Sequence, residues 1–112
     1  MPRRAEDPKW TDPGLLVMGS LAEGAKHGYA ILQDVEEANG VRLGPGTLYG
    51  AIARLEDRGL IEPLATDDPR RRAYRLTARG ATVLAEQVES MRRFAALSHR
   101  RLAQGGAAWG VA

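Results

Sequence analysis

The stretch that decides the fold spans residues 44–77 and reads GPGTLYGAIARLEDRGLIEPLATDDPRRRAYRLT. In its first half, Leu48, Ile52 and Leu55 repeat at the spacing of one helical face. This pattern predicts a helix over residues 47–58, which ends at the glycine that follows. The second half of the stretch has no such period and predicts extended chain.

The second half predicts a β-hairpin whose loop concentrates positive charge. Extended runs at 61–65 and 73–76 enclose a turn-forming segment that ends in Arg70, Arg71 and Arg72. Three adjacent arginines repel one another and have no packing role on a loop, so contact with phosphates explains their presence. The alternative is an ordinary solvated loop, partly neutralised by the two aspartates that precede the arginines.

Two more helices are predicted upstream of this stretch. Asp12 is placed to cap a helix that begins at Pro13, and the almost wholly apolar residues after it indicate burial on more than one side. A glycine-containing break at 23–28 separates it from a second helix expected over residues 29–38. The alternating residues 41–43 then predict one brief strand.

A long helix is predicted downstream, over residues 78–103, with Thr77 as its N-cap. At 1.5 Å per residue it would be about 39 Å long, which is more than one small domain can cover. Its apolar residues repeat at alternating spacings of four and three, as in a helix that pairs with a second helix. The predicted dimer seam consists of Leu84, Val88, Met91, Ala95 and Leu102, with Ser98 as its weak member.

The order of these elements predicts a mainly α fold with a small β-hairpin. Three helices followed by a hairpin form a winged helix-turn-helix, in which the third helix enters the major groove of DNA. We expect a flexible arm at 1–11, the winged helix-turn-helix at 12–77, a dimerisation helix at 78–103 and a flexible tail at 104–112.

Composition bounds the function. The chain has 112 residues, no cysteine and a net charge of +2, so disulfide scaffolds, thiol chemistry and zinc fingers are excluded. The charge is uneven, because residues 1–40 hold 4 bases and 7 acids whereas residues 41–80 hold 8 bases and 5 acids. The longest apolar run, 14–22, is too short for a membrane span, and the N-terminus lacks the pattern of a signal peptide. We expect a soluble cytoplasmic protein.

No catalytic or metal-binding constellation is visible. The two histidines, His27 and His99, lie far apart in sequence without a third nitrogen or sulfur ligand. The glycine-rich segment 40–47 lacks the lysine of a phosphate-binding P-loop, and no serine has a plausible base partner. We therefore expect no enzyme activity, no metal and no cofactor.

The predicted recognition helix has an outer face suited to DNA. Thr47, Gly50, Ala51 and Arg54 are expected on that face, with Tyr49 at its flank. Arginine forks onto guanine, while hydroxyl groups reach phosphates or base edges. Gly50 either permits close approach to the DNA backbone or fills a tight packing position inside the protein, and the sequence leaves both readings open.

Aromatic and imidazole side chains near the second helix extend the predicted DNA-facing set. His27 opens that helix, where it either donates to a phosphate or serves as a turn residue at the helix entry. Tyr29 and Tyr74 lie at element edges, where packing is the favoured role, and Tyr29 is also counted with His27 among the DNA-facing residues.

These segments together resemble the PadR family of bacterial transcriptional regulators. The resemblance covers roughly residues 14–102, in matching order and spacing. It implies a homodimer that binds an inverted repeat in double-stranded promoter DNA as a repressor, released in some members by a small aromatic or lipophilic compound. The short C-terminal region is similar to the subgroup with one long C-terminal helix. The segments that carry the resemblance are His27-Gly28-Tyr29, Gly44-Pro45-Gly46-Thr47-Leu48-Tyr49, Leu55-Glu56-Asp57-Arg58-Gly59-Leu60-Ile61 and Arg72-Ala73-Tyr74-Arg75-Leu76-Thr77.

Two positions depart from the family pattern. Gly44 stands where a serine is expected before Pro-Gly, so a hydroxyl cap and a phosphate contact are missing. Ala73 stands where many members carry a bulky residue before the tyrosine. Both changes concern DNA contacts and leave the predicted fold intact.

Two questions stay open from the sequence. Trp10, Met18, Met91 and Phe94 line a ligand cavity between subunits if the first and last helices meet there, or else they form a dry dimer interface. The alternative to a DNA-binding regulator is a winged-helix module that binds proteins and has lost DNA binding, which the acidic first third of the chain allows.

Overall fold

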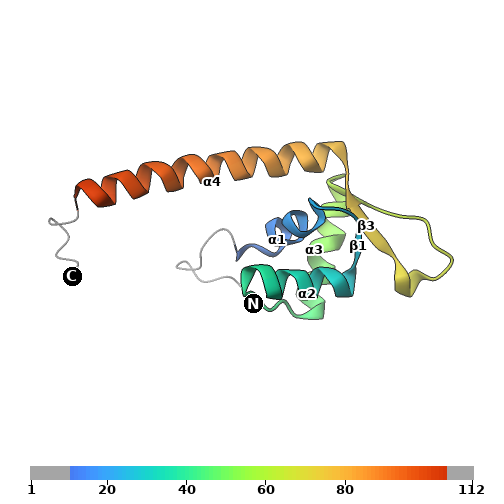
Figure 1. Cartoon of the computed structure of the whole chain (residues 1–112). Coiled ribbons are helices and arrows are strands. Elements are labelled where there is room, and N and C mark those ends of the chain that lie inside the picture. Colours follow the sequence, from blue (N-terminus) through green and yellow to red (C-terminus); the bar gives the residue numbers. More distant parts are fainter. Residues whose placement is uncertain (1–10, 106–112) are drawn as a thin grey trace.

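The computed structural model describes residues 11–105 (Figure 1). A body of three helices and a small sheet carries a fourth, long helix that projects from it (Figure 1). This confirms the predicted class, a mainly α winged helix-turn-helix. The predicted arm and tail lie almost wholly outside the described residues. In chain order the elements are α1 (Pro13–Leu21), β1 (Lys26–His27), α2 (Gly28–Asn39), α3 (Pro45–Asp57), β2 (Ile61–Pro63), η2 (Pro69–Arg71), β3 (Ala73–Leu76) and α4 (Ala78–Gln104).

The core lies where α1, α2 and α3 meet. Helix α1 begins as predicted, since Asp12 Oδ2 accepts the backbone N–H of Leu15 at 3.2 Å and Pro13 occupies the first helical position. Its apolar side chains are covered by the chain's own core, and each large side chain buried there contributes about 1.5–3 kcal/mol. The buried apolar residues are Leu16, Val17, Met18, Leu21, Ile31, Val35, Leu43, Leu48, Ala51, Ile52, Leu55, Leu60 and Ile61.

The sheet has three antiparallel strands in the order β1-β3-β2. The predicted hairpin is confirmed as β2 and β3, although β2 is shorter than expected and ends at Pro63. The strand predicted at 41–43 is wrong, because these residues have no regular structure and Leu43 is buried in the core. The third strand comes instead from β1, within the segment predicted as a break, where the backbone pairs with the free edge of β3.

A partly buried polar cluster joins α1, β1 and α2. The ammonium group of Lys26 donates to the Ser20 carbonyl at 2.5 Å and to the Ser20 hydroxyl at 3.2 Å. The same group forms ion pairs with Glu23 at 2.5 Å and with Asp34 at 3.3 Å. Hydrogen bonding from Ser20 and the charge of Lys26 lower the pKa of Asp34, against an opposing effect of burial. Lys26 therefore serves the fold, and its charge is unavailable to a ligand.

A tight junction connects α3, the sheet and α4. Thr77 donates its hydroxyl to the Gly59 carbonyl at 2.7 Å and its backbone N–H to the Leu60 carbonyl at 3.1 Å. The same hydroxyl accepts the N–H of Gly80 at 3.0 Å, which confirms Thr77 as the N-cap of α4. Gly80 packs directly on Leu60, so a Cβ added there would overlap the Leu60 carbonyl oxygen. The direction of α4 is thus set at its first turn.

Helix α4 leaves the body after its first turns. Val83 and Leu84 pack against the core, whereas the C-terminal half of the helix extends beyond the body (Figure 1). Beyond Leu84 the helix carries large exposed apolar side chains, with exposed fractions of 53% for Val88, 73% for Phe94 and 59% for Leu102. No helix within residues 11–105 is long and apolar enough to cross a membrane.

Candidate nucleic-acid interface

The outer face of α3 differs at one position from the predicted one. Thr47, Tyr49 and Arg54 are exposed, as expected, and Tyr49 has an exposed fraction of 52%. Ala51 is buried, so its predicted place on the outer face is wrong. The reason is helical geometry: Ala51 lies three residues after Leu48, on the same face as the core residues.

Gly50 is not in a tight packing position. A Cβ added to Gly50 would meet only the guanidinium Nη1 of Arg54, at 3.4 Å. The same geometry shows that the Arg54 side chain extends back along α3 towards Gly50. At Gly50 no side chain covers the helix backbone beside the exposed Arg54. This arrangement would let a DNA backbone or base edge come close.

Tyr49 is held against the start of α2. A Cβ added to the buried Gly28 would overlap the Tyr49 hydroxyl and lie 2.9 Å from its Cζ. The Tyr49 ring therefore lies directly on the Gly28 backbone, with its hydroxyl beside the first turn of α2. Tyr29 follows with an exposed fraction of 63%, so its predicted packing role is wrong and its side chain is available at the same surface.

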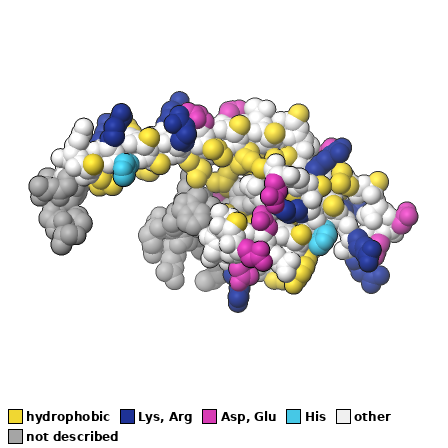
Figure 2. Space-filling model, in the orientation of Figure 1, with side chains coloured by type: hydrophobic (Ala, Val, Ile, Leu, Met, Phe, Trp, Pro, Cys, Tyr) yellow, Lys and Arg dark blue, Asp and Glu magenta, His cyan; other side chains and the backbone are white. Residues whose placement is uncertain are grey.

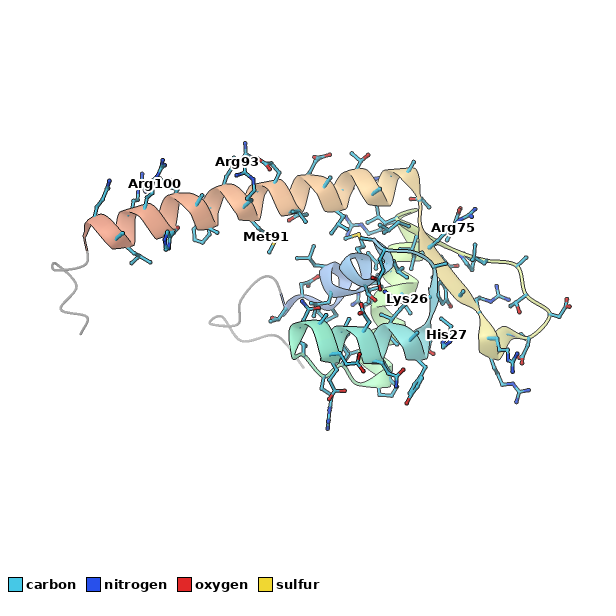
Figure 3. The ribbon with its side chains drawn as sticks, viewed as in Figure 1. Lys26, His27, Arg75, Met91, Arg93 and Arg100 are labelled. Atoms are coloured by element: carbon cyan, nitrogen blue, oxygen red, sulfur yellow. The ribbon has the colours of Figure 1, made fainter. Side chains whose placement is uncertain are left out.

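His27 lies at the meeting point of α2 and the sheet. It is the N-cap of α2, and its Nδ1 accepts the backbone N–H of Ala30 at 3.4 Å. Because the accepting nitrogen carries no proton, neutral His27 holds its proton on Nε2, on the far side of the ring. The side chain is exposed and projects from the start of α2 on the side of the sheet (Figure 3). His27 thus caps the helix and offers an outward donor.

The pairing of β1 with β3 brings His27 beside the hairpin loop. His27 pairs with Ala73, the residue directly after Arg72. The small side chain at position 73, noted above as a departure from the family pattern, therefore lies next to the imidazole. The sequence did not predict this proximity, because a two-residue strand leaves no periodic signal.

The loop between β2 and β3 presents its arginines at the tip. Asp68 caps the short turn η2 by accepting the N–H of Arg70 at 3.0 Å, and the same carboxylate pairs with the Arg70 side chain at 3.4 Å. Arg71 is exposed and Arg72 half-buried, and neither forms an ion pair with another described residue. Figure 2 shows these cations gathered beside acidic side chains at the loop end. The acidic side chains of the loop therefore neutralise only part of its positive charge.

An ion pair at the base of the hairpin escaped prediction. Arg75 Nε lies 2.7 Å from Glu62 Oε1, and the two residues are partners in the β2–β3 register. Tyr74, on the neighbouring position of β3, packs against the core as predicted. Burial raises the pKa of its hydroxyl, and the charges of Glu56 and Tyr49 act in the same direction. The ion pair could have been predicted only from the β2–β3 register, and that register cannot be assigned until the turn geometry is known.

The residues predicted for the dimer and ligand sites differ in burial in the single chain. Met18 is buried in the core, Met91 is half-buried on α4 and Phe94 is exposed, while Trp10 lies outside the described residues. In the predicted seam, Leu84 packs against the chain's own core, whereas Ala95 is exposed along with Val88 and Leu102. Met91 projects from α4 on the side of the body (Figure 3).

The model of the transcriptional regulator PadR-like family matches residues 17–86 of the chain, from α1 to the first part of α4. The chain belongs to the PadR-like family. It is a family of transcriptional regulators and not of enzymes, which agrees with the absence of a catalytic constellation from the sequence.

Curated relatives of this PadR-like chain come from Streptomyces fradiae and Mycobacterium tuberculosis. It is 46% identical over 82 residues to an uncharacterised 37.1 kDa protein in transposon TN4556 of Streptomyces fradiae, covering 73% of the chain and 24% of that protein. The chain thus spans about a quarter of that relative. It is 34% identical over 83 residues to the transcriptional regulator Rv3488 of Mycobacterium tuberculosis, covering 72% of the chain and 77% of that regulator.

Solved structures of PadR proteins share the fold. A PadR family regulator of Clostridium difficile aligns with a TM-score of 0.72 and 26% identity, covering 80% of this chain and 97% of the other. PadR of Bacillus subtilis, solved in complex with operator DNA, aligns with a TM-score of 0.60 and 24% identity, covering 67% of this chain and 45% of the other. At that identity the second likeness concerns the fold alone.

Proposed function

We propose that the protein is a repressor that binds an inverted-repeat operator as a homodimer. One arrangement carries this proposal: β1–β3 pairing brings His27 beside the residue that follows the arginine loop, and the Tyr49 ring of α3 lies on the adjoining Gly28. The surface offers an arginine for base edges, hydroxyl and imidazole donors for phosphates, and a positive loop for the neighbouring backbone. The proposed DNA-facing residues are His27, Tyr29, Thr47, Tyr49, Gly50, Arg54, Arg70, Arg71 and Arg72.

The decisive experiment measures DNA affinity as a function of salt. The operator is first selected from a random DNA pool, and the triple variant R70A/R71A/R72A is then compared with the wild type. We expect weaker binding and a shallower salt dependence in the variant, because each lost phosphate contact reduces counterion release. A matched triple variant on α4, R92A/R93A/R100A, removes equal charge from residues outside the proposed DNA-facing set, and we expect it to retain affinity. Arg93 and Arg100 point away from the body (Figure 3).

The salt experiment also separates this proposal from the protein-interaction alternative. A winged helix that binds only proteins would enrich no repeat and show no affinity to lose at high salt. Equal affinities for the loop variant and the wild type would contradict the role of the arginines while leaving α3 as the reading element.

The dimer is proposed on the exposed apolar side chains of α4. Val88 and Leu102 have exposed fractions of 53% and 59% in the single chain, and Ala95 lies between them on the helix. A second copy would cover this surface, with residues 12–77 as the DNA-binding domain and 78–103 as the dimerisation helix. The test is sedimentation of the variant V88E/L102E, for which we expect a monomer. A dimer of unchanged stability would contradict this seam.

Release by a hydrophobic ligand is proposed on one further observation. Within residues 11–105, Phe94 has the largest exposed fraction among the exposed large apolar side chains, 73%, and it lies on α4 next to the seam rather than in it. Phe94 and the half-buried Met91 are therefore the side chains that would contact such a ligand in the dimer. We expect a planar hydrophobic dye to bind the dimer saturably and F94A to weaken this binding. A dye affinity that F94A leaves unchanged would contradict it.

A further inference from the structure

A cavity lies between α1 and the C-terminal half of α3. It is separate from the proposed dimer surface and shares one residue, Arg54, with the proposed DNA surface. Its volume is about 330 Å³, at the small end of the range for pockets that hold small molecules. Its walls combine apolar side chains with charged ones. The apolar lining consists of Leu15, Met18, Ala51 and Leu55, and the charged lining consists of Asp12, Arg54, Asp57 and Arg58.

The charged groups on the α3 side are unengaged within the described part of the chain. Arg54, Asp57 and Arg58 are exposed, and none of them forms a side-chain hydrogen bond or ion pair with another residue of 11–105. Arg54 and Arg58 are four residues apart, so they lie on the same side of the helix. The cavity therefore offers two guanidinium groups and a carboxylate to a ligand.

The balance of charges selects the chemical class of that ligand. A carboxylate group suits the two arginines, because guanidinium binds it through paired hydrogen bonds. A simple anion would also meet the negative charges of Asp57 and Asp12, and a simple cation would meet the two arginines. A molecule that carries both signs and an apolar body satisfies all three parts of the lining.

We propose that this cavity binds an apolar α-amino acid. The carboxylate pairs with Arg58 and Arg54, the ammonium group with Asp57, and the side chain contacts Met18 and Leu55. None of the residues proposed for the dimer surface takes part, so this site differs from the proposed Phe94 site.

Ligand binding and DNA binding share Arg54. Its side chain lines the cavity, yet its guanidinium group reaches back towards Gly50 on the outer face of α3. A bound carboxylate draws that guanidinium towards the cavity and away from DNA, so the amino acid lowers operator affinity. This second step rests on the proposed function, whereas the binding step does not.

Calorimetric titration of the full chain, without DNA, tests the binding step. We expect saturable binding of one or more of L-leucine, L-methionine and L-phenylalanine. For the amino acid that binds, the analogue without the amino group and the analogue without the carboxyl group should each bind at least about tenfold more weakly, as expected when a charged partner is lost. Equal binding of either analogue would overturn the zwitterion assignment, and no binding of any amino acid would overturn the site.

Matched variants locate the site. R58Q and D57N should each weaken binding at least about tenfold, while R93Q, on the outward side of α4, should leave it unchanged (Figure 3). Arg58 and Asp57 are exposed, so these variants should keep the wild-type melting temperature in the absence of ligand. Unchanged binding in R58Q and D57N would place the ligand elsewhere.

A mobility shift on the selected operator tests the coupling separately. The amino acid should weaken operator binding by the wild type and leave that by R58Q unchanged. If the amino acid binds in calorimetry but does not change operator affinity, the proposed coupling is overturned and the proposed binding site still stands. Absence of any selected operator would contradict the proposed function without altering the calorimetric result.

Discussion

Contact between Gly28 and Tyr49 links two segments that lie far apart in the sequence. A Cβ at position 28 cannot coexist with the Tyr49 ring where it lies. Since Tyr49 is half-exposed, its side chain has room to swing outward, and the cost to folding is small. The glycine therefore matters for where the tyrosine hydroxyl points rather than for whether the domain folds.

We predict that G28A weakens operator binding several-fold and changes the free energy of unfolding by less than about 1 kcal/mol, because only an exposed side chain moves. Paired mobility-shift and urea-unfolding measurements check this. The control is the double variant G28A/Y49A, which should bind DNA no more weakly than Y49A alone. Additive losses of DNA affinity would show that the glycine acts independently of the tyrosine.

Asp34 makes the stability of the fold depend on pH in the acidic range. Its pKa is lowered in the folded chain by the Ser20 hydrogen bond and by Lys26, so the contribution of Asp34 to stability is present above its unfolded pKa. This contribution is lost as the pH falls through the lower, folded pKa. We predict that stability decreases from pH 6 to pH 3 more steeply in the wild type than in D34N. Urea unfolding at the two pH values measures this, and parallel decreases would contradict it.

The junction between the sheet and α4 acts at the scale of elements. Gly80 packs on Leu60, and Thr77 binds the backbone on both sides of the contact. Here the overlapping atom belongs to the backbone, which cannot swing aside as the Tyr49 side chain can. A side chain at position 80 must therefore move the whole first turn of α4.

We predict that G80A destabilises the chain by about 1–3 kcal/mol, the usual cost of overpacking, although alanine is the better helix former. The matched control is A81G, one position further along the exposed side of the same turn, which should lose only the helix propensity of about 1 kcal/mol. Thermal unfolding compares the two variants. If G80A were as stable as the wild type, the junction would not be rigid.

Elements with strong local signals were predictable, and those made by distant pairing were not. The helices carried repeating apolar positions and capping residues such as Asp12 and Thr77, so their places were correct to within about two residues. The strand at Lys26–His27 exists only because the edge of β3 pairs with it. The alternation at 41–43 suggested a strand, yet its apolar residues are needed to close the core.

At the scale of the molecule, only part of the candidate site could be predicted from the sequence. The role of Arg70, Arg71 and Arg72 as candidate phosphate contacts could be predicted from the sequence alone, because three adjacent charges on a loop are recognisable without a structure. The exposure of Tyr29 and the burial of Ala51 depended on how the helices pack. The cavity between α1 and α3 has no counterpart in any sequence pattern, since its lining comes from two helices separated by a third.

The proposed dimer makes a prediction about the operator. Two recognition helices on one rigid dimer would meet successive major grooves about 10–10.5 base pairs apart. Insertion of five base pairs between the half-sites turns one of them to the opposite face of the duplex. We expect this insertion to weaken wild-type binding strongly and to leave the affinity of V88E/L102E nearly unchanged. Mobility shifts on the two operators measure the difference, and a wild type indifferent to the insertion would argue for independent monomers.

The junction at Thr77 and Gly80 has a consequence for how such regulators diverge. In the proposed dimer, base preference is held in α3 and the loop, whereas the separation of half-sites depends on the angle at which α4 departs. The two properties occupy different residues, so a paralogue can acquire a new spacing by altering the junction and keep its base preference. In the reverse case, changes confined to α3 redirect the regulator to new promoters of unchanged architecture.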